Sequence, residues 1–392
     1  MPLITDGTAV LVFLIILIGA IYRISELTFV APFFKYLPPV IWVYFLPMIS
    51  SNLGIIPQDH ELYLWIRTYL LPTALVLMLL SANVPALAKL GGKAVLTVLS
   101  GSLGIALGAV ISFSILQFWL PAEAWKGLGA LTGSWIGGSA NMVAVATSVG
   151  TPEAMLGPII VVDTIVGYGW MGIVIALAVF QDRIDKWNKV DRSIVDDLNK
   201  RMKTVYDTKR RPLKYIDLIT MLAVGFGVGY AMVQLGVYLP DVGAVLTSFG
   251  WAIIMASLVG IALSFTRLSD LEFAGASSVG NFFFYLLLAT IGARADLAGI
   301  LDAPVFLLAG ILIIMIHATV LFTLGKLLKS PMFLIATASQ SNIGGPITAP
   351  IIATVYQGSL APVGLLMAVV CSISGTFIAL MVAQIMYWIS IM

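Results

Sequence analysis

The sequence has little charge, one cysteine and two histidines, and each scarcity excludes a class of protein. Charged residues make up 10% of the chain, against about 25% in soluble domains, while the mean hydropathy is +1.04. Cys371 cannot form a disulfide framework, and with His60 and His317 it supplies no zinc cluster. No Walker loop is present, which argues against ATP-driven transport. A net charge of +2 argues against nucleic acid as a partner. We expect a protein of the lipid bilayer, with neither enzymatic activity nor a cofactor.

Ten apolar segments are long enough to cross a bilayer as helices. They cover 7–22, 36–53, 62–82, 93–119, 152–181, 214–237, 243–266, 275–293, 303–325 and 358–391. The predicted fold class is therefore an all-α polytopic membrane protein. The one long polar segment, 182–214, holds eleven of the 21 Lys and Arg residues, and its apolar residues recur every three or four positions. That pattern is typical of a basic amphipathic helix on the cytoplasmic face; by composition alone, a solvated linker is the alternative.

Two further stretches are apolar yet rich in Gly, Ser, Asn and Thr, and they are similar to each other. The first runs from Leu131 to Val149 and the second from Ala338 to Val355. At an offset of 207 residues, the sequence SWIGG that starts at Ser134 aligns with SNIGG that starts at Ser341. Unwound backbone is tolerated at membrane depth only inside protein or beside a water-filled cavity. Related interruptions in the two halves of a chain therefore indicate the binding site of a transporter.

The charges of the short connections predict how these two stretches sit in the membrane. If each stretch enters and leaves on one side, the basic connections fall in the cytoplasm and the acidic ones outside, as the positive-inside rule requires. Each half of the chain then has five crossings and one re-entrant segment, and this odd number turns the second half upside down. We predict inverted repeats over 1–181 and 214–392, joined by a linker at 182–213, with both chain termini outside.

Three motifs carry a resemblance to a known family. They are GSWIGGSANMVAVA from Gly133, GxxxxVDTIVGYGW from Gly157 and SQSNIGGPITAP from Ser339. Together they resemble an uncharacterised bacterial membrane protein family, the one typified by YjcL, over essentially the whole chain. The resemblance implies the fold of the cation–proton antiporter and anion transporter superfamily, whose symporters carry paired broken or re-entrant segments. It also implies a mobile bundle made of 93–181 and 303–391, with 7–82 and 214–293 as scaffold and homodimer contact. It supplies no substrate.

Glycines and polar side chains of the two stretches are the candidate ligands of a small-molecule solute. Unwinding at paired glycines frees carbonyl groups for a cation, while the N-terminal ends of half-helices present partial positive charge to an anion. The alternative is that small residues here only allow close helix packing. The candidates are Ser134, Trp135, Gly137, Gly138, Ser139, Asn141, Ser341, Asn342, Gly344, Gly345 and Thr348.

Asp163 is the most informative single residue because it lies deep in an apolar segment, where ionisable groups are costly and rare. In the antiporters that this chain resembles, an acidic residue on the helix after the broken one carries the coupling ion. At the 207-residue offset the second half has Val370 instead, so the repeats differ at their charged position. A structural aspartate bonded to hydroxyl groups is the alternative. The other coupling-ion candidates, for sodium or a proton, are Thr147, Gln340, Ser372 and Ser374.

We expect a secondary active transporter of the bacterial plasma membrane that works by alternating access of the elevator type. Two half-helix N-termini and no deep acidic cluster favour a small organic anion, an amino acid or a short peptide, carried with sodium or protons. The rival is a monovalent cation–proton antiporter, which would need only Asp163 as carrier. His317 also lies within an apolar segment, and is either a proton relay or a packing residue.

Overall fold

The structure is a computed structural model that describes residues 2–30, 33–34, 39–80, 91–190, 211–241, 247–295, 303–357 and 360–392. Within these ranges the regular elements are helices and none is a strand, which confirms the predicted all-α class. Eight described helices are long and apolar enough to cross a membrane. A ninth span results if α13 (Ser248–Leu263) and the 3-10 helix η3 (Arg267–Ala274), bent by 94°, are counted together. The chain is a multi-pass membrane protein.

Each of the ten predicted segments corresponds to a helix. Besides α13 these are α1 (Gly7–Ser25), α3 (Pro39–Asn52), α4 (Glu61–Leu80), α6 (Gly92–Leu116), α9 (Glu153–Ala176), α12 (Tyr215–Gly236), α14 (Ala276–Arg294), α15 (Ala303–Leu327) and α18 (Ala361–Ser390). The two Gly-rich stretches form the helix pairs α7 (Ala124–Gly137) with α8 (Ser139–Ser148) and α16 (Met332–Ile343) with α17 (Gly345–Tyr356). After α9 the chain continues through η2 (Leu177–Phe180) into α10 (Gln181–Asn188). Most of the predicted amphipathic linker, 191–210, lies outside the described residues.

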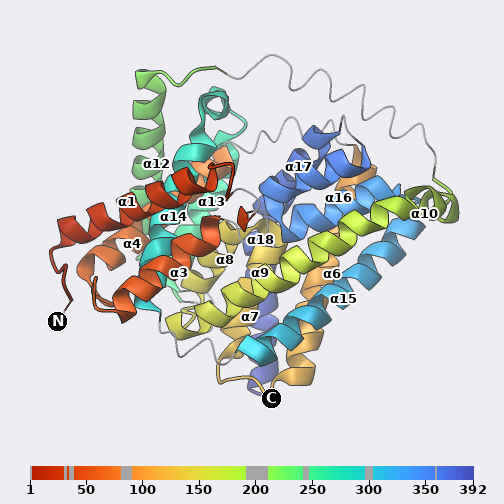
Figure 1. Ribbon diagram of the computed structural model, residues 1–392, viewed down its shortest axis with the longest axis horizontal. Helices are drawn as coiled ribbons and strands as arrows, with labels where there is room; N and C mark the ends of the chain where they lie inside the picture. Colours follow the sequence, from red (N-terminus) through yellow and green to blue (C-terminus); the bar gives the residue numbers. More distant parts are fainter. Residues whose placement is uncertain are drawn as a thin grey trace.

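The helices pack into two bundles, each built from both halves of the sequence (Figure 1). The first, which we call the α4 bundle, contains α1, α3, α4, α12, α13 with its extension η3, and α14. In it α4 contacts α1, α12, α13 and α14, while α3 packs against α14 and α1. The second, the hairpin bundle, contains α6 to α10 and α15 to α18. The helices of the α4 bundle come mainly from 7–82 and 214–293, and those of the hairpin bundle come mainly from 93–181 and 303–391.

Small residues allow a close helix approach in the hairpin bundle between α6 and α15. A Cβ atom built on Gly104 would lie 2.9 Å from the Cα atom of His317, and one on Gly108 would lie 2.9 Å from the carbonyl oxygen of Ile313. Both contacts are with backbone, which cannot move aside. Because the hydrophobic effect does not drive helices together in lipid, close van der Waals packing of this kind stabilises the helix pair.

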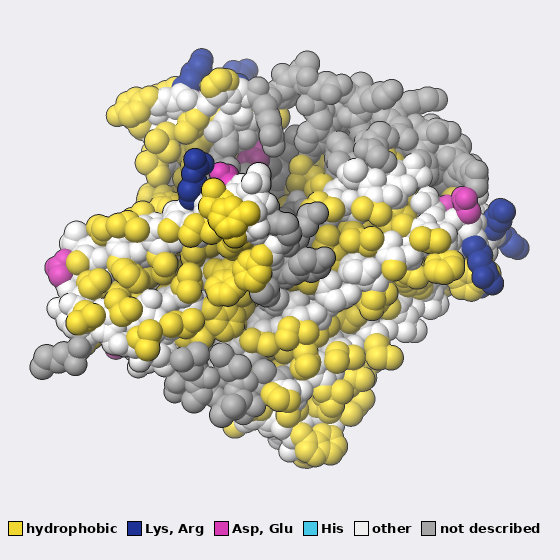
Figure 2. Space-filling view, viewed as in Figure 1, with side chains coloured by type: hydrophobic (Ala, Val, Ile, Leu, Met, Phe, Trp, Pro, Cys, Tyr) yellow, Lys and Arg dark blue, Asp and Glu magenta, His cyan; other side chains and the backbone are white. Residues whose placement is uncertain are grey.

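The surface fits a bilayer environment. In the space-filling view, hydrophobic side chains cover much of the visible face, while the Lys and Arg side chains lie mainly toward its upper and right edges (Figure 2). Fully exposed apolar side chains of this kind would be unfavourable in water but cost nothing against lipid tails.

Candidate functional site

The α7–α8 pair is a hairpin that folds back on itself at Gly138, where φ is +94°. A Cβ atom on Gly133 in α7 would lie 2.8 Å from the carbonyl oxygen of Asn141 and 3.0 Å from a methyl group of Val145, both in α8. At the other end, the Thr151 hydroxyl donates to the carbonyl of Lys126 at 3.3 Å, so the chain leaves the hairpin beside the point where it began. With about 1.5 Å per residue, neither arm could cross a bilayer of about 30 Å. The stretch therefore has the hairpin geometry expected of a re-entrant segment.

The α16–α17 pair forms a second hairpin, which starts and ends at the opposite end of α9. Its tip lies at Gly344 and Gly345, and Gly345 has a φ of +62°. The Tyr356 hydroxyl, at the end of this hairpin, donates to the carbonyl of Val174 near the C-terminus of α9 at 2.5 Å. At the start of the hairpin, the carbonyl of Ser330 accepts from the side chain of Asn188, in the α10 extension of α9, at 3.1 Å. The first hairpin instead begins and ends next to the N-terminus of α9.

The two hairpin tips meet beside the middle of α9. A Cβ atom on Gly345 would lie 3.8 Å from the Cα atom of Gly138, so the glycines of the two tips are in contact. One turn before the first tip, the Ser134 hydroxyl donates to the Asp163 carboxylate of α9 at 3.1 Å. The structure therefore brings together two sequence stretches 207 residues apart with the one carboxylate predicted to act with them.

A cavity of about 820 Å³ lies between the two bundles and has both hairpin tips in its wall. The hairpin bundle contributes the tips, the middle of α9 with Asp163, and part of α18; the α4 bundle contributes α3, α4, η3 and α14. Asp163 is partly exposed, and it faces this cavity. The volume is in the range of sites that enclose small organic ligands.

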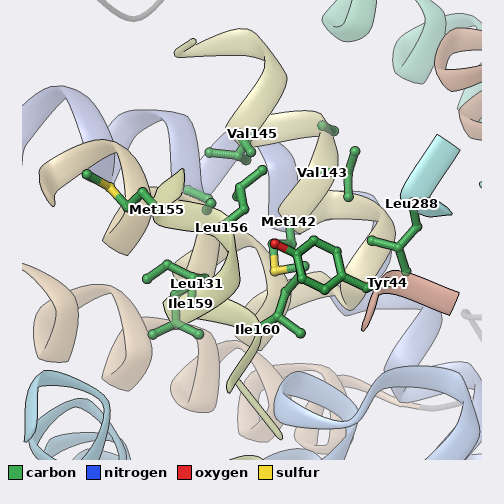
Figure 3. Packing of buried hydrophobic residues seen from close by; sticks show 14 of the residues in the cluster. Tyr44, Leu131, Met142, Val143, Val145, Met155, Leu156, Ile159, Ile160 and Leu288 are labelled. Atoms are coloured by element: carbon green, nitrogen blue, oxygen red, sulfur yellow. The ribbon is translucent and has the colours of Figure 1, made fainter. Parts of the chain in front are cut away.

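Toward the N-terminus of α9, which we call the Arg294 end, the cavity is closed by side chains from both bundles. Tyr44 and Leu288 of the α4 bundle belong to one buried apolar cluster with Met142 and Ile160 of the hairpin bundle (Figure 3). Beyond them, Arg294 of α14 forms an ion pair with Glu153 at 2.7 Å, and a longer one with Asp59 at 3.7 Å. At the other end, the wall of the cavity extends to Ser269, Glu272 and Phe273 of η3.

Ten of the predicted site residues line this cavity. They are Ser134, Gly137, Gly138, Ser139, Asn141, Asp163, Gln340, Gly344, Thr348 and Ser372. Six others do not line it: Trp135, Thr147, Ser341, Asn342, Gly345 and Ser374.

The two hairpin asparagines are predicted solute ligands, but the oxygen and the nitrogen of each side chain already have hydrogen-bond partners in the protein. The Asn141 side chain accepts from Thr376 at 2.7 Å and donates to the carbonyl of Ser372 at 3.1 Å, which joins the first hairpin to α18. Asn342 accepts from Ser102 at 2.7 Å and donates to the carbonyl of Val98 at 3.1 Å, which joins the second hairpin to α6. These contacts indicate that both asparagines position the hairpin tips.

The remaining residues outside the lining lie in helix contacts, and all but Ser374, which is partly exposed, are buried. The Ser341 hydroxyl donates to the carbonyl of Thr337 within its own helix, and that of Ser374 donates to Val370 in the same way. The Trp135 side chain is buried, and the ring packs against Gly310 of α15. The Thr147 carbonyl accepts from Arg67 at 3.4 Å, toward the Arg294 end.

At the first tip, one of the carbonyl groups that the helix break frees also has a hydrogen-bond partner in the protein. The carbonyl of Gly137, one of those predicted to coordinate a cation, accepts from the Ser372 hydroxyl at 3.2 Å. Of the polar groups around the tip, the Asp163 carboxylate is the strongest acceptor that faces the cavity. It is therefore the group best placed to hold a cation or a proton.

His317 lies in a buried network away from the cavity. Its Nδ1 atom is 2.9 Å from the carbonyl oxygen of Gly101, and its Nε2 atom is 2.9 Å from the Ser339 hydroxyl, which also accepts from Trp170 at 2.7 Å. Because a carbonyl only accepts, Nδ1 carries the hydrogen and Nε2 accepts from the serine. This arrangement is that of a neutral histidine that ties α15 to α6 and α16.

Sequence reasoning missed the α4 bundle's share of the site. Tyr44, Asn281, Tyr285 and Glu272 line the cavity from α3, α14 and η3, and Tyr168 does so from α9. The Tyr44 hydroxyl is fully buried and has no hydrogen-bond partner among the described residues. Asn281, a polar amide within an apolar helix, was the one signal that could have identified this wall.

Comparison with known proteins places both hairpins within a recognised family. Residues 13–389 match the family described as protein of unknown function (DUF819). The chain is also similar to the uncharacterized membrane protein YjcL of Bacillus subtilis (strain 168), with 26% identity over 352 residues, which cover 84% of this chain and 86% of the relative. The family match extends from α1 to the last turns of α18 and so includes the cavity and Asp163. The chain belongs to the DUF819 family.

Proposed function

We propose that this protein is a secondary active transporter that carries a small solute by alternating access. One observation carries the proposal: two re-entrant hairpins from opposite ends of α9 meet tip to tip at Asp163, in the wall of a cavity between two bundles. Paired helix interruptions at the membrane midplane are the usual site of substrate and ion binding in such proteins. The opposite directions of the two hairpins also support the inverted-repeat organisation over 1–181 and 214–392.

The two bundles supply the parts that alternating access requires. The contacts between them at the Arg294 end are an apolar cluster, an ion pair and long hydrogen bonds to the carbonyls of Thr147 and Ser148, all of which can separate without unfolding either bundle. Each hairpin is tied to its own bundle by an asparagine, so we expect it to move with that bundle. A shift of the hairpin bundle along a fixed α4 bundle, the elevator movement, would expose the tips at the other membrane face.

The coupling ion in this proposal is sodium or a proton, bound at Asp163. A carboxylate next to a hydroxyl at the hairpin tip offers oxygen ligands to sodium, and a protonation site to a proton. A bare monovalent cation–proton antiporter is the alternative, since it needs only Asp163. The cavity favours a solute carrier, because about 820 Å³ is far more space than an unsolvated ion requires.

The test is uptake into proteoliposomes under an imposed sodium or proton gradient, with the wild-type protein and Asp163→Asn. In a symporter the variant should keep solute binding but lose the anionic ligand of the ion. Loss of a charge-assisted contact costs about 2–3 kcal/mol, which is a rise of roughly 30- to 150-fold in the apparent sodium constant. Asp241→Asn is the control, because this exposed carboxylate lies outside the cavity lining and accepts from the amide of Ser248 at the start of α13. Normal coupling and ion affinity in Asp163→Asn would refute the assignment.

A further inference from the structure

The cavity lining selects for the charge of the solute. The described residues of its wall include two charged side chains, Asp163 and Glu272, and both are acidic. The Glu272 carboxylate already accepts from the backbone and hydroxyl of Ser277, at 3.0 and 2.8 Å. With no Lys, Arg or His in the described lining, a solute with two or more negative charges would meet repulsion without a countercharge.

Next to these carboxylates, the first hairpin tip offers backbone donors. The amide groups of Ser139 and Ala140 start α8 and have no hydrogen-bond partner among the described residues, because the first bonds of the helix are made by Asn141 and Met142. Gly138 precedes them with a positive φ, and a Cβ atom built there would meet nothing within 4 Å. The tip therefore exposes free N–H groups to open space in the cavity wall. Such a helix start attracts a single negative charge.

The other hairpin contributes a second donor to the wall of the same cavity. The Gln340 side chain is 1% exposed and lines the cavity, and its Oε1 atom accepts from the Thr348 hydroxyl at 3.2 Å. This bond leaves the Nε2 group as a buried donor with no partner among the described residues. Buried donors in proteins are normally satisfied, so an unpaired one on a residue of the cavity wall points to a ligand oxygen as its partner.

The wall that the α4 bundle contributes has an apolar part besides its polar side chains Tyr44, Asn281, Tyr285 and Glu272. From α4 and α14, the side chains of Leu75, Leu79, Phe284 and Leu288 face the same cavity. A solute whose oxygen atoms are held at the hairpin tips would therefore place the rest of its structure against aliphatic and aromatic groups. Hydroxyl groups of a solute that lay against these four apolar side chains would be left unpaired.

We propose that the solute carries one carboxylate and an apolar body. The carboxylate binds the amide groups of Ser139 and Ala140 and the Gln340 side chain, and the apolar body packs against the α4 bundle. This inference rests on the proposed transport function, and it narrows the candidate solutes to apolar amino acids and apolar monocarboxylates. It excludes dicarboxylates, phosphates and amines that lack a carboxylate.

The experiment measures thermal stabilisation of the purified full-length protein by four probes: leucine, the α-keto acid of leucine, leucinamide and succinate. We expect leucine or its α-keto acid to raise the melting temperature, whereas leucinamide and succinate do not. A response to both acids shows that the carboxylate and the apolar body are sufficient. A response to leucine alone shows that the amino group is also bound.

Two substitutions of Gln340 locate the carboxylate. Gln340→Glu places a negative charge at the site and should weaken binding of the acid about 10-fold or more, while the uncharged Gln340→Met tests the loss of the donor alone. Gln117→Glu, at the end of α6 and outside the cavity lining, is the matched control and should bind normally. Equal binding by Gln340→Glu and Gln117→Glu would overturn the proposal, as would a larger shift with succinate or leucinamide, or no shift with either acid. Uptake of a dicarboxylate that depends on Asp163 would also refute it, yet would leave the transporter assignment intact.

Discussion

The Glu153–Arg294 ion pair offers a direct test of the closed end of the cavity. It joins α9 of the hairpin bundle to α14 of the α4 bundle, with the Arg294 and Glu153 side chains 28% and 30% exposed. Arg67 lies in the same small pocket as both residues. In Glu153→Gln the pocket therefore keeps two positive charges without the carboxylate between them. We expect this substitution to favour an arrangement in which the two bundles separate at the Arg294 end.

The size of the effect follows from the exposure of the pair. Exposed ion pairs contribute up to about 1 kcal/mol and charge-assisted hydrogen bonds in proteins about 1.5–3 kcal/mol, so a pair at this exposure should contribute about 1–1.5 kcal/mol. If that energy is present only in the described arrangement, its loss changes the ratio of the two arrangements by roughly 5- to 12-fold. The Arg23–Glu26 pair, at 3.2 Å on the surface of α1, provides the control substitution Glu26→Gln.

The assay is cysteine labelling by a membrane-impermeant maleimide. Met142 belongs to the apolar cluster at the closed end and is 3% exposed, so Met142→Cys should react only when that end opens. The native Cys371 is 1% exposed and gives little background. In Glu153→Gln the labelling rate should rise roughly 5- to 12-fold. In Glu26→Gln it should not change. The same rate in both variants would refute the view that this ion pair holds the bundles together.

Two further predictions concern helix packing and topology. In Gly104→Ala the new methyl group would meet the His317 backbone, so the substitution should lower the free energy of unfolding by about 1–3 kcal/mol, the cost of overpacking, and the melting temperature with it. Gly169→Ala is the control, because it has open space around it and should leave the melting temperature unchanged or slightly higher. Equal effects of the two substitutions in a thermal unfolding assay would contradict the close α6–α15 contact. In intact cells, Asp241→Cys should react with an impermeant reagent and Lys186→Cys should not, and labelling of Lys186→Cys from outside would reverse the predicted orientation.

The sequence predicted the helices and the two hairpins well because both depend on local properties. Apolar runs of sufficient length can only be helices in lipid, and the charges of the loops indicated that each Gly-rich stretch returns to its own side. In the structure the Thr151 hydroxyl donates to the carbonyl of Lys126, so the first stretch ends beside the residues where it begins, as such a return requires. Asp163 was identifiable for the same reason, since a carboxylate deep in an apolar segment is costly wherever the segment packs.

The sequence could not show which polar groups of the hairpins remain available to a solute. Asn141 and Gln340 are similar amides in similar stretches, yet Asn141 has partners on both its side-chain atoms and Gln340 keeps a free donor. The difference depends on Thr376 and Ser372, which lie more than 200 positions from Asn141. Likewise, nothing near Tyr44 in the sequence indicates that its hydroxyl would be buried beside a cavity. These are properties of long-range packing.

The two related stretches have also diverged in what their equivalent positions do. Ser134 and Ser341 align at the 207-residue offset, but Ser134 donates to Asp163 in the cavity wall, while Ser341 donates to the backbone of its own helix. Val370 stands at the position equivalent to Asp163, packs against the apolar cluster around α16 and does not line the cavity. The carboxylate and its hydroxyl partner therefore come from the same half of the chain. In a symmetric pair of sites, two carboxylates would face each other across the meeting tips and repel, whereas one carboxylate leaves the opposite tip free to present the Gln340 donor to a solute.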